Sequence, residues 1–109
     1  MNQQVKFEIA KLLKEKGFDF PRKASQNDYQ GEYPTIAEVV MWLYEKHGIW
    51  IWIACREFED GGIGFIPNGR TIPFKKKNGV VVDIIPYMVK TSPTEAYEAA
   101  IEHILNKLI

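Results

Sequence analysis

The C-terminal segment constrains the fold of this sequence most strongly, because residues 92–109 read as one capped amphipathic helix. Ser92 and Glu95 have the spacing of a capping box, and Pro93 occupies the first helical position, where no backbone amide is needed. One face of the predicted helix is apolar, and its residues recur at helical spacing: Tyr97, Ala100, Ile101, Ile104, Leu105 and Leu108. This face is expected to pack on a second layer of structure.

A first helix is predicted near the N-terminus, over about residues 3–16. Gly17 ends it, and the apolar Phe18 is expected to fold back onto its last turn. Residues 19–34 have no sustained period and are predicted to form a long loop. The apolar stripe of this helix consists of Val5, Ile9, Leu12 and Leu13.

A second helix is predicted over about residues 36–47. Thr35 and Glu38 repeat the capping-box spacing at its start, and Gly48 is expected to end it. Its apolar stripe consists of Ile36, Val39, Val40 and Leu43.

The next segment, residues 49–58, is rich in β-branched and aromatic residues and predicts a strand. Alternation places Ile49, Ile51 and Ile53 on one face of the strand, and Trp50 and Trp52 on the other. A strand that begins apolar on both faces is expected either to be covered on both or to present one face to a partner.

Two later turns divide the remaining β-type sequence. A short strand over residues 63–66 is predicted to end before the turn-forming sequence Pro67-Asn68-Gly69. Asn78-Gly79 favours a tight type I′ turn, which predicts a hairpin between residues 70–77 and 80–89.

These elements predict an α+β fold in one domain over residues 1–109. Their order is helix, helix, an antiparallel meander of three or four strands, and helix. A single layer of helices is expected on the sheet, with the second and third helices on the face that carries Ile49, Ile51 and Ile53. A chain of 109 residues is long enough to bury a self-sufficient core.

Composition and spacing argue against several functional classes. Fourteen basic and fourteen acidic residues give zero net charge, so the broad attraction to phosphate that supports non-specific nucleic-acid binding is missing. The single cysteine, Cys55, excludes an intramolecular disulfide and a Cys-pair zinc site, and is predicted to be buried in its strand. His47 and His103 lack metal-ligand spacing.

We therefore expect no enzyme, no cofactor and no bound metal, because no nucleophile–base pair, carboxylate dyad or metal set can be assembled from these residues. The longest apolar run, near residues 48–55, is far shorter than the eighteen or so residues that a membrane-spanning helix needs. The chain is expected to be cytoplasmic, without membrane contact, as a monomer or homodimer.

Two groups of residues are candidates for binding. Trp50 and Trp52, with Trp42 nearby in sequence, can form an aromatic platform for a protein partner, although packing beneath a helix or the long loop is the alternative. The tip of the predicted hairpin carries Lys75, Lys76 and Lys77 beside Phe74, with Arg70 and Lys90 as further basic neighbours. This set is suited to single-stranded nucleic acid, although lysines also keep exposed turns soluble.

Two blocks of the sequence, residues 34–51 (PTIAEVVMWLYEKHGIWI) and 92–109 (SPTEAYEAAIEHILNKLI), together make up about a third of the chain. They resemble a group of small uncharacterised proteins found in gut Bacteroides and in their phages and mobile elements. The resemblance implies a bacterial, mobile-element origin and transfers no activity or site residue. We expect an accessory module that binds an unknown protein partner, with nucleic-acid binding through the lysine hairpin as the alternative.

Overall fold

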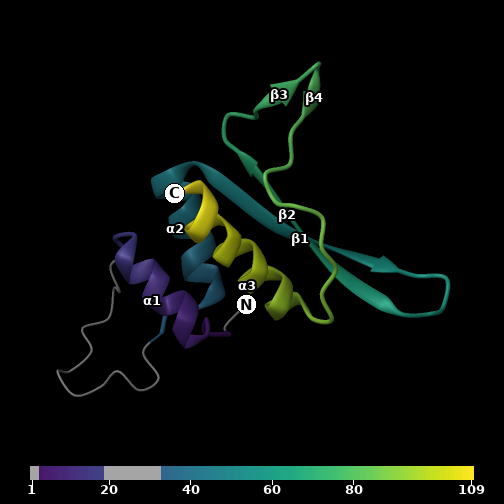
Figure 1. The fold of residues 1–109 in the computed structure, drawn as a ribbon, viewed down its shortest axis with the longest axis horizontal. Helices are drawn as coiled ribbons and strands as arrows, with labels where there is room; N and C mark the ends of the chain where they lie inside the picture. The colour runs from purple at the N-terminus through teal and green to yellow at the C-terminus, as the bar shows by residue number, and fades with distance from the viewer. Residues whose placement is uncertain (1–2, 19–32) are drawn as a thin grey trace.

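The computed structural model describes residues 3–18 and 33–109, so most of the predicted loop over 19–34 lies outside the described residues. The described part has an α+β fold with the predicted order of elements (Figure 1). The elements are α1 (Phe7–Glu15), α2 (Ile36–His47), β1 (Ile49–Glu57), β2 (Ile63–Thr71), β3 (Lys76–Lys77), β4 (Val80–Val81) and α3 (Pro93–His103), followed by the π-helical turn η1 (Ile104–Leu108).

The predicted capping box at the start of α2 is confirmed. The N–H of Glu38 donates to the Thr35 hydroxyl at 3.2 Å, and the N–H of Thr35 donates to the Glu38 carboxylate at 3.0 Å. The helix ends where predicted, at Gly48, whose φ of +63° is a left-handed conformation that glycine adopts without strain.

Thr35→Ala is expected to lower the free energy of unfolding by about 1 kcal/mol, because it leaves the Glu38 N–H without its acceptor. Chemical denaturation measures this change, and Thr35→Ser, which keeps the hydroxyl, is the matched control. An equal loss in both variants would show that the threonine methyl group, and not the cap, carries the effect.

Helix α1 begins later than the predicted residue 3. The N–H of Val5 donates to the carbonyl of Pro34, and the N–H of Ile36 donates to the carbonyl of Gln3, so this part of the chain is extended and pairs with the entry to α2. The predicted end is confirmed, because the N–H of Phe18 donates to the carbonyl of Leu13 at 2.9 Å and its side chain is buried.

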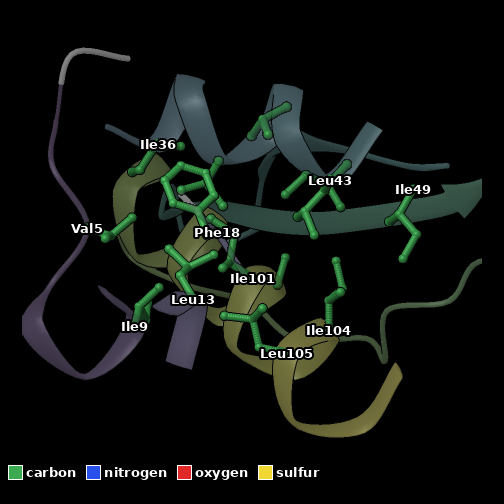
Figure 2. Close-up of a cluster of buried hydrophobic side chains, with 14 of the residues drawn as sticks. Val5, Ile9, Leu13, Phe18, Ile36, Leu43, Ile49, Ile101, Ile104 and Leu105 are labelled. Atoms are coloured by element: carbon green, nitrogen blue, oxygen red, sulfur yellow. The ribbon is translucent and has the colours of Figure 1, made fainter. Parts of the chain in front are cut away.

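The hydrophobic core lies between the three helices and one face of the sheet. Side chains from α1, α2, α3 and β1 point toward one another there (Figure 2). Helix α2 packs on β1, α3 packs on both β1 and β2, and α1 packs on α3 and η1. Ile49 and Ile51 are buried in this core as predicted, whereas Ile53, further along the same face, is only partly buried.

The second strand is longer than predicted, because β2 runs through Pro67, Asn68 and Gly69 instead of ending before them. It pairs antiparallel with β1, with Pro67 opposite Ile53. Phe65 and Gly69, two residues either side of Pro67, direct their N–H groups away from β1, to the carbonyl of Lys90 and the carboxylate of Asp83. The nitrogen of Pro67 points to that same edge, so no hydrogen bond with β1 is lost.

The predicted hairpin over residues 70–77 and 80–89 is much shorter in the structure. The Asn78-Gly79 turn is present, with positive φ at both residues, but only β3 and β4 pair across it. The chain then follows the far edge of β2 in an irregular course, in which the Asp83 carboxylate accepts hydrogen bonds from the N–H groups of Gly69 and Ile85. The Asp83 carboxylate thus accepts a hydrogen bond that the backbone carbonyl of a neighbouring strand would otherwise accept from Gly69.

The C-terminal helix differs from the prediction at both ends. The N–H of Glu95 donates to the Ser92 hydroxyl as expected, but the Glu95 carboxylate accepts from the hydroxyls of Thr91 and Ser92, not from the Ser92 amide. At the other end, the wider π-helical turn bonds the N–H of Ile109 to the carbonyl of Ile104. The extra residue shifts the apolar stripe, so Leu108 is 42% exposed and Ile109 packs against the core in its place.

Candidate binding surface on the outer face of the sheet

The face of the β1–β2 sheet that points away from the buried Ile49 and Ile51 is called the outer face here, and its candidate binding residues are Trp50, Trp52, Arg70 and the adjoining Phe74. Trp50 belongs to this face because it alternates along β1 with the buried Ile49 and Ile51. Arg70 belongs to the same face because it lies directly opposite Trp50 in the pairing of β1 with β2. Trp50 is 40% exposed, so the first tryptophan of the strand stays at the surface.

Arg70 connects the aromatic residues of this face. Its guanidinium carbon lies 5.1 Å from the centre of the Trp52 ring and 5.8 Å from the centre of the Phe74 ring. Its Nε atom is buried and lacks a hydrogen-bond partner among the described residues. Contact with two rings favours an arginine in a defined orientation. Arginine carries further N–H donors at its tip, which suit a carboxylate or phosphate.

Trp50 has a second aromatic neighbour that the sequence did not single out. The ring of Tyr44, on α2, meets the Trp50 ring edge-on at a centroid distance of 5.7 Å. Tyr44 itself is 44% exposed, so the pair extends the apolar surface past the edge of β1. Neither Tyr44 nor Arg70 was a predicted partner-binding residue. The sequence indicated Arg70 only as a basic neighbour of the lysine hairpin, and its place opposite Trp50 depends on the extension of β2 through Pro67.

Trp42, the third predicted partner-binding residue, lies apart from Trp50 and Trp52. Its ring is partly buried against the core and meets two other rings edge-on. The distance between ring centroids is 5.2 Å to Phe18 and 4.8 Å to His47. This packing was the alternative considered for the tryptophans. The structure therefore brings together two of the three residues and places the third against Phe18 and His47.

The predicted lysine group lies next to the outer face. Lys75, Lys76 and Lys77 are exposed around the short β3–β4 hairpin, which stands clear of the helices (Figure 1). Phe74 precedes them, is 52% exposed and contacts Arg70, so aromatic and basic groups form one continuous surface. Lys90 does not belong to it, because its backbone pairs with Phe65 near the opposite end of β2.

The remaining candidate residues do not form a chemical centre in the described part of the chain. Cys55 is exposed, contrary to the prediction, because it lies beyond the helix-covered part of β1. His47 is exposed at the end of α2 and packs against Trp42. Within residues 3–18 and 33–109, histidine, cysteine and carboxylate side chains form no cluster with the geometry of a metal site. The helices described there are also too short or too polar to cross a membrane.

Comparison of the chain with protein-family models, with curated proteins and with solved structures found no match in any of the three.

Proposed function

We propose that this protein is a small accessory module, of the phage and mobile-element type that its sequence resembles, which acts by binding another protein through the outer face. The exposed pairing of Trp50 with Tyr44, next to Trp52 and Arg70, carries this proposal. Tryptophan, tyrosine and arginine are the residue types that contribute most often to binding hot spots, because each combines a large contact area with a polar group. Trp50 and Trp52 lie on a hydrogen-bonded strand, so their backbone is already ordered and less conformational entropy is lost when a partner binds.

Affinity capture from a lysate of a gut Bacteroides strain, followed by mass spectrometry, tests this function. The wild-type chain is expected to enrich a defined protein that Trp50→Ala fails to retain. Phe7→Ala is the matched control, because Phe7 is also an exposed aromatic residue but lies on α1. Equal capture by the wild type and Trp50→Ala would contradict the assignment of the outer face.

A second candidate is binding of single-stranded nucleic acid, favoured by the contact of Arg70 with Phe74 beside the lysine hairpin. Bases stack on aromatic rings, and neighbouring lysines neutralise the phosphates. In an anisotropy titration with a single-stranded oligonucleotide, changing Lys75, Lys76 and Lys77 together to glutamine would reduce the salt slope by up to about two units, at ~0.7 per lost contact. Submicromolar binding at about 150 mM salt, lost in this variant, would favour nucleic acid over a protein partner.

A further inference from the structure

The outer face carries positive charge and no carboxylate at its own strand positions. Alternation assigns to this face the even-numbered residues of β1 and β2, within 50–56 and 64–70. Two of them are arginines, Arg56 and Arg70, and none is acidic. Among the described residues, neither arginine forms a salt bridge. Most of the described acidic residues lie on the three helices, so a chain with no net charge still has one positively charged face.

At one end of the outer face, contacts with aromatic rings hold the guanidinium of Arg70 in place. Its Nε atom is buried, and the rings of Trp52 and Phe74 both lie against it. Its two Nη atoms are not buried and make no hydrogen bond to the described residues. A guanidinium ordered in this way loses little conformational freedom when it binds a carboxylate through two parallel hydrogen bonds.

At the other end of the outer face, Arg56 also lies against an aromatic ring. Its guanidinium carbon is 5.7 Å from the centre of the Phe58 ring, and its side chain is exposed. Arg56 lies opposite Gly64, where a Cβ atom would come within 2.6 Å of Cε2 of Phe58. The glycine therefore leaves the space that the Phe58 ring occupies, and the ring supports the arginine.

An apolar interval separates the two arginines. Arg70 lies opposite Trp50, which is six residues from Arg56 on β1, so the two attachment points are about 20 Å apart along the strands. Trp52 and Ile66 lie within this interval. We propose that the outer face binds an acidic segment of a partner protein, with one carboxylate on Arg70, a second on Arg56 and apolar side chains over the interval. This inference rests on the proposed function, because it specifies the chemistry of the partner at the same surface.

The spacing of the charges favours an acidic protein segment over a nucleic acid. A nucleic-acid strand carries a phosphate at every nucleotide, so a strand along this face would place phosphates over the apolar interval as well as over the arginines. A polypeptide has a neutral backbone and can combine carboxylates with apolar side chains. Lys75, Lys76 and Lys77 extend the positive charge past the Arg70 end only, beyond Phe74.

Selection from a random peptide library tests this chemistry. The immobilised full chain is expected to enrich peptides that combine aspartate or glutamate with aromatic or aliphatic residues. Selection on Arg70→Gln is expected to lose much of the acidic enrichment, because the ordered guanidinium is absent. Selected peptides without an excess of acidic residues, or a failure to select any peptide, would overturn the proposal.

Fluorescence anisotropy with one selected acidic peptide resolves the two arginines. Arg70→Gln is expected to weaken binding by about tenfold or more, because hydrogen bonds to a charged group are lost. Arg56→Gln, at an exposed site, is expected to weaken binding by about two- to fivefold. Arg70→Lys keeps the charge without the planar fork and is expected to recover only part of the affinity. Lys11→Gln, on α1, removes an exposed charge elsewhere and is the matched control. Unchanged affinity in both glutamine variants of the arginines would overturn the proposal.

The protein captured from the lysate separates this inference from the proposed function. A partner that Trp50→Ala loses, but that Arg70→Gln and Arg56→Gln both retain, would leave the proposed function standing and overturn the acidic chemistry. Equal capture by the wild type and Trp50→Ala would contradict the proposed function itself. A single-stranded oligonucleotide that displaces the selected peptide and binds more tightly at about 150 mM salt would assign the arginines to phosphates instead.

Discussion

Ile101→Ala is expected to lower the free energy of unfolding by about 2–4 kcal/mol, because it leaves a cavity where α3 meets the other helices and the sheet. The Ile101 side chain is fully buried and belongs to the core cluster (Figure 2). The surrounding side chains come from several elements, so their collapse into the space is expected to be incomplete. Denaturant unfolding followed by circular dichroism measures the loss.

Ile53→Ala is the matched control for that measurement, since it deletes the same atoms from a partly buried site. We expect it to cost about 1 kcal/mol, near the average for point substitutions in general. A cost for Ile53→Ala as large as that for Ile101→Ala would mean that the core extends further along β1 than the contacts indicate.

Gly69→Ala is expected to lower the free energy of unfolding by about 1–3 kcal/mol through overpacking. A Cβ atom at Gly69 would lie 2.8 Å from Cγ1 of Ile85, 3.2 Å from Cγ2 of Ile51 and 3.3 Å from Cγ1 of Ile84. The φ angle of Gly69 is not positive, so the expected cost arises from packing and not from backbone strain.

A double-mutant cycle separates this packing cost from other effects. Ile85→Ala removes the nearest obstructing atom, so adding Gly69→Ala in that background is expected to cost less than in the wild type. Equal costs in the two backgrounds would show that the contact with Ile85 is not the cause.

Local signals predicted the helices well. The Thr35 cap, the Gly48 end of α2 and the return of Phe18 onto α1 all depend on residues within one or two turns of each other, and the structure contains each of them. The course of β2 depends instead on distant residues. Pro67-Asn68-Gly69 has the composition of a turn, and only pairing with β1 and the segment after β4 shows that the proline nitrogen faces the outer edge.

The candidate surface could be predicted only in part, because some of its contacts are local in sequence and others join distant residues. Alternation along one strand is local, so it placed Trp50 and Trp52 on one face correctly. The separation of Trp42 depends on which flank of α2 meets Phe18, and the contact of Arg70 with Phe74 depends on the path of the chain after β2. Neither can be obtained from residue spacing within a single element.

The exposure of the β3–β4 hairpin affects how freely its sequence can vary. Every residue from Ile72 to Val80 is exposed, and the hairpin contributes nothing to the core cluster. Substitutions and small insertions there are expected to leave folding almost untouched. Yet the hairpin adjoins Phe74 and Arg70, so such changes alter the proposed binding surface. If that proposal holds, the specificity of the surface can change without compensating mutations in the core.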